Sequence, residues 1–143
     1  MAPPPGETDD IAARSSRGDW LNLAIRILID DGISEVKVQS IARQLNVSRS
    51  SFYWFFKSLA DLHDQLLDVW LAKNTGPIME RAMKPASDII TAILHVFECW
   101  VDENLFDPKL DMAVRLWARR DDKVRSVVRQ ADTQRLKAIS AMF

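Results

Sequence analysis

Three polar side chains, Arg49, Ser50 and Tyr53, fall on one face of a short predicted helix. The guanidinium of Arg49 can donate two hydrogen bonds to one guanine, a contact worth about 1–3 kcal/mol of discrimination between bases. The opposite face has Phe52 and Phe56 at i and i+4, which can anchor the helix to a core. This division of faces predicts a helix that enters the major groove of DNA, with Arg49 as the base contact and Ser50 assisting.

A second group of side chains around this face suits the phosphate backbone, which positions a protein but carries no base sequence. The group comprises Lys37, Gln39, Ser48, Tyr53, Trp54 and Lys57. Between residues 32 and 58, four basic residues accompany one acid, a local charge of +3 in a chain of net charge -1. Such a basic patch favours contact with a polyanion.

Short helices joined by a turn must hold these residues in place. The expected first helix, 37–45, has one apolar stripe, formed by Val38, Ile41, Ala42 and Leu45. Asn46 tolerates the left-handed backbone conformation that ends a helix. The hydroxyl of Ser48 is expected to cap the next helix, 49–55. Two short helices around a three-residue turn have the layout of a helix-turn-helix.

The rest of the chain also shows helical spacing, with no alternating strand pattern, so the expected fold class is all-α. Ser58 and Asp61 predict the start of a long helix, and Gly76-Pro77 its end. The other expected helices are 16–30, 78–83, 87–103, 109–119 and 121–143, with a short connector at 33–35.

The stretch IARQLNVSRSSFYWFFKSLADL resembles the signature of tetracycline-repressor-type (TetR family) transcriptional regulators. The residues that match are Ile41, Ala42, Leu45, Val47, Ser48, Tyr53, Phe56 and Leu62. The chain departs from the signature at Asn46, where Gly is usual, at Lys37, where Thr caps, and at Phe55, where a His contacts phosphate. No phosphate role is therefore assigned to Phe55. The later run LDMAVRLWARRDDKVRSVVRQADTQRL is similar to the ligand-domain helices of one subgroup.

The resemblance implies a homodimeric, ligand-responsive repressor, in which an effector bound to the C-terminal helices weakens the hold on operator DNA. It divides the chain into a disordered tail (1–15), a helix-turn-helix DNA-binding domain (16–57) and a helical effector-binding and dimerisation domain (58–143). The long helix joins the last two. Two further helices, which usually build the dimer interface, are expected to follow Phe143, so the third region is expected to be incomplete.

Apolar residues at helical spacing in the C-terminal region can line an effector cavity, since ligand pockets are mostly apolar. The candidates are Trp70, Met79, Met83, Phe97, Trp100 and Trp117. Taken singly, each of them fits a place in the core better than one in a cavity, as Cys99 does. The basic residues between Lys109 and Arg135 are interpreted as a solvated helix face rather than a second nucleic-acid surface.

Two other classes of function remain open. The helix-turn-helix can be a protein-interaction module without DNA binding. His95 and Glu98, at i and i+3, resemble half of a metal site in a helical-bundle enzyme, but no second pair is evident. The chain has no Cys cluster, Gly-rich phosphate loop or nucleophile elbow, so neither an enzyme nor a cofactor is expected. The N-terminus MAPPPGETDD lacks the features of a signal peptide, which favours a cytoplasmic protein.

Overall fold

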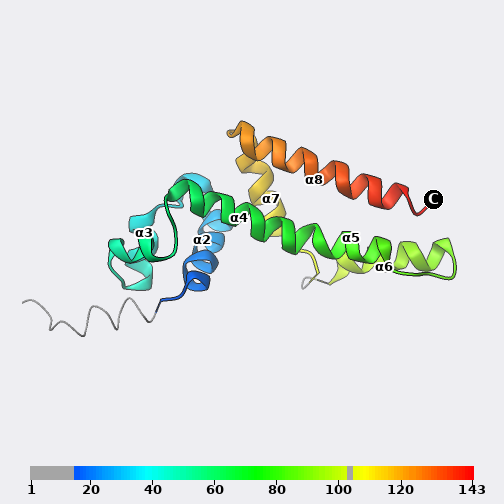
Figure 1. Ribbon diagram of the computed structural model, residues 1–143, viewed down its shortest axis with the longest axis horizontal. Helices are drawn as coiled ribbons and strands as arrows, with labels where there is room; N and C mark the ends of the chain where they lie inside the picture. Colours follow the sequence, from blue (N-terminus) through cyan, green and yellow to red (C-terminus); the bar gives the residue numbers. More distant parts are fainter. Residues whose placement is uncertain (1–14, 103–104) are drawn as a thin grey trace, which may run out of the picture. The chain divides into compact units, whose positions relative to one another are not determined.

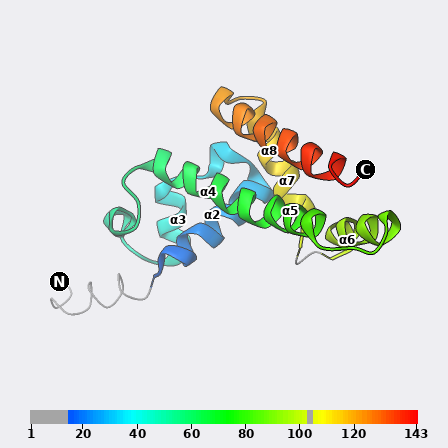
Figure 2. The ribbon, with the colours of Figure 1, turned by 45° about the vertical axis from the view of Figure 1, so that its right-hand side comes forward.

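The computed structural model describes residues 15–102 and 105–143, apart from the side chain of Trp100, and every regular element in this part of the chain is helical (Figures 1 and 2). The α-helices are α2 (Arg17–Asp31), α3 (Val38–Leu45), α4 (Leu59–Asn74), α5 (Gly76–Met83), α6 (Ile89–Val101), α7 (Pro108–Ala118) and α8 (Asp122–Ser140); the 3₁₀-helices are η1 (Ile33–Glu35) and η2 (Arg49–Trp54). The all-α prediction is confirmed. No described helix has the length and apolar character needed to cross a membrane.

The chain forms two compact units, one up to Leu66 and the other from Leu67 to Phe143, so the boundary between them falls inside α4. The tail predicted for residues 1–15 lies outside the described residues, except for Ser15, which is buried.

Helix α2 begins and ends where local chemistry predicts. The hydroxyl of Ser16 accepts a hydrogen bond from the backbone N–H of Asp19 at 3.1 Å, and the Asp19 carboxylate accepts one from the backbone N–H of Ser16 at 2.8 Å. This reciprocal capping box satisfies two of the donors that a helix start leaves unpaired. Gly32 ends the helix at φ 91°, a conformation that side chains with a Cβ rarely adopt.

The start of α4 also follows the sequence. The backbone N–H of Asp61 donates to the Ser58 hydroxyl at 3.1 Å, and the Asp61 carboxylate accepts from the backbone N–H of Lys57 at 2.9 Å. The bond from Lys57 is the largest cause that lowers the pKa of Asp61. Ser58 therefore acts as the predicted N-cap.

Helix α4 ends at Asn74, close to its predicted end, but the next helix begins earlier than the predicted residue 78. Gly76 and Pro77 do not separate two helices; they form the first turn of α5, with only Thr75 between it and α4. Thr75 has a right-handed helical conformation, and its backbone N–H donates to the carbonyl of Leu71 at 2.9 Å. Proline is well tolerated in a first turn, because the N–H that it lacks would have had no helical partner there.

Aspartates start the three later helices. Asp88, Asp107 and Asp121 each accept hydrogen bonds from backbone N–H groups of α6, α7 and α8 respectively. A carboxylate at this position also interacts favourably with the positive end of the helix dipole. Helix α8 packs against α7 and α5, and α6 packs against α5.

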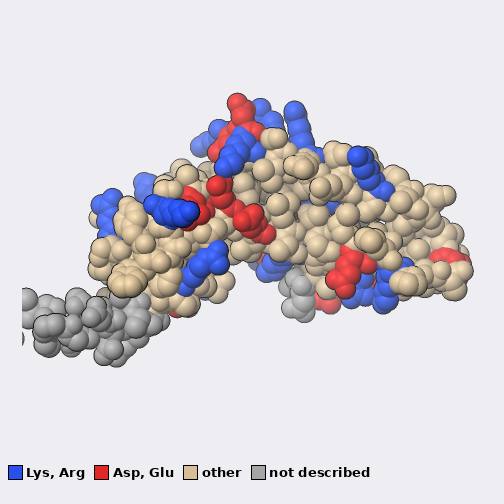
Figure 3. All heavy atoms as spheres, in the orientation of Figure 1, with Lys and Arg blue, Asp and Glu red and all other residues tan. Residues whose placement is uncertain are grey.

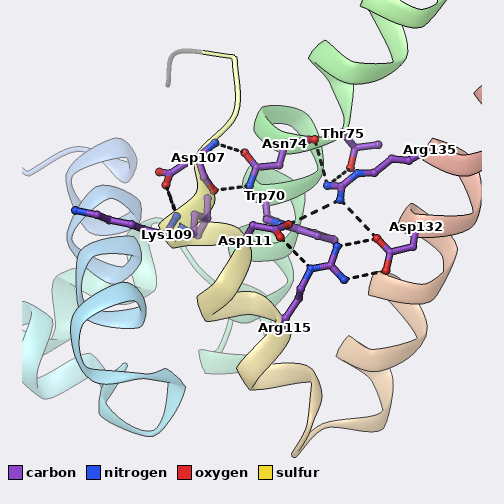
Figure 4. A network of polar contacts seen from close by, with 10 residues as sticks. Trp70, Asn74, Thr75, Asp107, Lys109, Asp111, Arg115, Asp132 and Arg135 are labelled. Carbon is purple, nitrogen blue, oxygen red and sulfur yellow. Dashed lines mark hydrogen bonds and ion pairs between the residues drawn. The ribbon is translucent and has the colours of Figure 1, made fainter. Parts of the chain in front are cut away.

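An ion-pair network joins α7 to α8 (Figure 4). Arg115 donates two hydrogen bonds to Asp132, at 2.9 and 2.7 Å, and its Nε donates to Asp111 at 2.9 Å. The bonds to Asp132 and Asp111 raise the pKa of Arg115, and the same pairing lowers the pKa of Asp132. Bidentate pairs of this kind fix geometry as well as supplying energy.

Arg135 connects this network to the end of α4 (Figure 4). Its guanidinium lies 5.3 Å from the ring centroid of Trp70 and donates to the backbone carbonyl of Asn74 and the hydroxyl of Thr75, both at 3.1 Å. Trp70 in turn donates from Nε1 to Asp111 at 3.1 Å. Only 11% of the Arg135 side chain is exposed, and this burial lowers its pKa.

The interpretation of residues 109–135 as a solvated helix face is therefore wrong for Arg115 and Arg135. Helical spacing puts Asp111 four residues before Arg115 and Asp132 three residues before Arg135, but it did not show that Asp132 of α8 also meets Arg115 of α7.

Candidate nucleic-acid interface

The turn between α3 and η2 is built on Asn46. Asn46 has φ 56° and ψ 45°, the left-handed conformation predicted for it. The backbone N–H of Val47 donates to the carbonyl of Ala42 at 3.0 Å, which satisfies a carbonyl that the helix end would leave unpaired. Ala42 is itself buried, as its small side chain requires where α3 meets its neighbours. The chain thus reverses tightly after Leu45.

The element after the turn is a 3₁₀-helix rather than the predicted α-helix. Its bonds join residues three apart: Ser51 N–H donates to Ser48 C=O, and Phe55 N–H donates to Phe52 C=O, each at 3.1 Å. The segment has only six residues, so few hydrogen bonds between residues four apart could form in it. Short 3₁₀ segments of this kind are frequent as connectors between helices. A 3₁₀-helix has three residues per turn, so residues 50 and 53 lie on the same face of η2, one turn apart.

Ser48 does not act as the predicted side-chain cap. Its hydroxyl lies 3.0 Å from the hydroxyl of Ser50, and no side-chain bond to a following backbone N–H forms. The backbone carbonyl of Ser48 instead accepts from both the N–H and the hydroxyl of Ser51. Ser48 and Ser50 therefore present adjacent exposed hydroxyls at the start of η2.

An aromatic cluster holds the inner face of η2. Phe52 and Phe56 are almost fully buried, and their rings stack with centroids 5.1 Å apart. Phe52 also meets Trp20 of α2 at 5.5 Å and the edge of Tyr53 at 5.2 Å. The predicted inward position of Phe52 and Phe56 is what the structure shows.

The outer face of η2 is exposed over its whole length. Arg49, Ser50, Tyr53 and Trp54 are all exposed, Tyr53 at 60% and Trp54 at 78%. The remaining predicted DNA contacts of this unit, Lys37, Gln39, Ser48 and Lys57, are exposed as well. Among the residues that the structure describes, no acid forms an ion pair with the side chain of Arg49 or Lys37, whereas the charge of Lys57 acts on the nearby carboxylate of Asp61. Figure 3 shows basic side chains on the drawn face of this unit.

Phe55 differs from its neighbours. It is half-buried at the end of η2, and its backbone N–H is bonded within the segment. A phenyl ring offers no hydrogen-bond donor to a phosphate, so no contact is assigned to it.

The six residues predicted to line an effector cavity do not come together as a set. Trp70 lies within the polar network, Trp117 is buried in α7, Phe97 is 53% exposed on α6, and the side chain of Trp100 is outside the described part. Met79 and Met83 do line a common hollow, of about 560 Å³, between α5 and α8.

Most residues lining this hollow were not anticipated. The complete lining is Met79, Ala82, Met83, Gln134, Lys137, Ala138, Ala141 and Met142. The sequence did contain a signal, because positions 134, 138 and 141 fall on one face of α8 at i, i+4 and i+7.

Glu98 has a partner that disfavours the metal interpretation. Its carboxylate accepts from Arg81 at 2.7 Å, which directs it to α5 rather than to a shared site with His95. In residues 15–102 and 105–143, no group of three or more potential ligands converges.

Comparison with known proteins agrees with this geometry. The family model for bacterial regulatory proteins of the tetR family matches residues 21–66, which covers α2 through the first half of α4. A curated relative, the HTH-type transcriptional regulator AcrR of Shigella flexneri, is 29% identical over 96 residues, 64% of this chain and 44% of the relative. The chain thus spans less than half the length of that relative. No solved structure gives a significant match.

An all-helical chain with an exposed, basic second element in a helix-turn-helix defines a DNA-binding class of protein. The match over residues 21–66 shows that this segment is similar to bacterial regulatory proteins of the tetR family.

Proposed function

We propose that the chain is a transcriptional repressor that binds operator DNA through η2 and the residues around it. The observation that carries the proposal is the two-sided character of η2. Phe52 and Phe56 hold one side in the core, and Arg49, Ser50 and Tyr53 are left exposed on the other. An exposed arginine beside hydroxyl groups suits the base edges and phosphates of DNA.

Base and phosphate contacts are divided among the exposed side chains. Arg49 is assigned to a guanine, with Ser50 beside it, because a planar guanidinium can donate two parallel hydrogen bonds. The phosphate contacts are assigned to Lys37, Gln39, Ser48, Tyr53, Trp54 and Lys57. Trp54 can donate only from its indole N–H, so its role is to position rather than to specify.

The regulatory part of the proposal is that a homodimer binds the operator and that a small apolar effector in the residues 67–143 weakens this binding. The relative's printed name, a transcriptional regulator, supports regulation as the activity. Acting on bacterial DNA would place the protein in the cytoplasm.

Salt-dependent DNA binding tests the proposal. The full chain is titrated with duplex fragments from the promoter region next to its own gene, and with a scrambled duplex, at several salt concentrations. Specific binding whose affinity falls steeply with salt is expected, because phosphate contacts release counterions. Equal affinity for both duplexes, or an affinity that salt does not change, would contradict the proposal and favour the protein-interaction module.

A further inference from the structure

We propose that the hollow between α5 and α8 binds a molecule with an apolar chain and one anionic head group, and that Lys137 holds the head group. The hollow is formed within one compact unit by residues 79–83 and 134–142. Binding of this ligand does not depend on the proposed function. Only its role as the effector rests on the proposal that the chain is a ligand-responsive repressor.

The shape of the hollow follows from small side chains. Ala82 of α5 and Ala138 and Ala141 near the end of α8 leave space between the two helices, where longer side chains would close it. Its volume of about 560 Å³ falls in the usual range for small-molecule sites, about 300–1,000 Å³.

Three methionines supply most of the larger apolar surface. Met79, Met83 and Met142 have unbranched, polarisable side chains that can adjust to a flexible chain. Met83 is 78% exposed, which is a large apolar area to leave in water. An alkyl chain in the hollow would remove that area from solvent.

The charge at the hollow selects the head group. Lys137 is the one ionisable side chain among the described residues of the lining, and no acid in the described part of the chain pairs with it. Glu98 pairs with Arg81 and Asp132 with Arg115, and the exposed Glu80 of α5 is not among the residues that line the hollow. A cationic ligand would therefore find no counter-charge among the lining residues, whereas an anion would find Lys137 and the amide of Gln134.

The test uses three probes with the same alkyl chain, each below its micelle concentration: dodecanoate, 1-dodecanol and dodecyltrimethylammonium. Each is titrated into the full chain without DNA by isothermal titration calorimetry. Saturable binding is expected in the order dodecanoate, dodecanol, dodecyltrimethylammonium. Because no DNA is present, failure of this test and failure of operator binding are separate results.

Substitutions locate the site. Lys137→Met is expected to weaken dodecanoate binding by about two- to fivefold, the range for a solvent-accessible ion pair, and to leave dodecanol binding unchanged. Lys123→Met, in the first turn of the same helix, is the matched control and should change neither. Ala138→Trp should abolish binding of both probes while the thermal unfolding transition is retained.

The proposal would be overturned by any of three outcomes: no saturable dodecanoate binding, equal affinity for the three probes, or loss of dodecanoate binding in Lys123→Met as large as in Lys137→Met. Dodecanoate affinity that falls as the protein concentration rises would show that a second copy covers the hollow, which also overturns it.

Discussion

Phe52 stacks on Phe56 with ring centroids 5.1 Å apart and ring planes 21° apart, which fixes the inner side of η2 to the start of α4. The exposed side of the same six-residue segment holds Arg49 and Tyr53. Because η2 is too short to be stable alone, the position of its exposed side depends on this buried pair.

Phe52→Ala should therefore destabilise the N-terminal unit. Removing a buried phenyl ring typically costs about 3–5 kcal/mol, because the apolar contacts are lost and a cavity remains. Thermal unfolding monitored by circular dichroism measures the change. Trp54→Ala is the matched control on the same segment, since a 78% exposed side chain should change stability by no more than about 0.5 kcal/mol. Equal effects of the two substitutions would contradict the assigned faces.

Arg49 and Lys57 should differ in how they affect DNA binding. Arg49→Ala is expected to relax the preference at one base position, at a cost of about 1–3 kcal/mol on the best sequence. Lys57→Ala should weaken binding to all sequences about equally and reduce the slope of log affinity against log salt by about 1. Competition binding on a set of operator variants separates the two. A uniform loss for both variants would reject Arg49 as the base contact.

The left-handed conformation at Asn46 predicts an unequal response to two substitutions. Asn46→Val should destabilise by about 1–2 kcal/mol, because a β-branched side chain is strained at φ 56°. Asn46→Gly should change stability by less than about 1 kcal/mol, since glycine adopts this conformation without strain. Urea unfolding of both variants measures the difference. Similar losses would show that the Asn46 side chain, and not its backbone, stabilises the turn.

The pair of Arg115 and Asp132 should make stability depend on acid pH. The hydrogen bonds from Arg115 are the main cause that lowers the pKa of Asp132 below its ordinary 3.8 in the folded protein. Because the pKa of Asp132 is lower in the folded than in the unfolded protein, its ion pair stabilises the fold fully at pH values above the unfolded-state pKa. This stabilisation is lost as the pH falls through the folded-state pKa.

Asp132→Asn is therefore expected to lower stability by about 1 kcal/mol at pH 7, a modest figure because the Asp132 side chain is 44% exposed. The difference from wild type should shrink as the pH is lowered from about 5 towards 2. Thermal unfolding over that range measures it. Asp122→Asn, which removes an exposed pair with Arg125, should have little effect throughout. A difference that stayed constant with pH would contradict the assigned cause.

Features that depend on neighbours in the chain were predictable. The cap at Ser58, the turn at Asn46 and the faces of η2 each follow from residues three or four positions apart, and the structure agrees at each one. The cap predicted at Ser48 does not form, and the capping box at Ser16 was not predicted. The 3₁₀ form of η2 and the inclusion of Gly76 and Pro77 in the first turn of α5 were not predictable in this way. Local sequence preferences do not decide between an α-helical and a 3₁₀ turn over a few residues, or the exact residue at which a helix begins.

The sequence by itself determined which residues of this protein are helical, which are apolar and which exposed face could contact DNA, because periodicity and caps are local properties. Only the tertiary structure decided which faces meet. It brought Arg135 from α8 to Trp70 and Asn74 of α4, and it placed Lys137 at the edge of a hollow with Met79. These partners are dozens of residues apart, and helical spacing assigns a residue to a face without specifying what packs against that face.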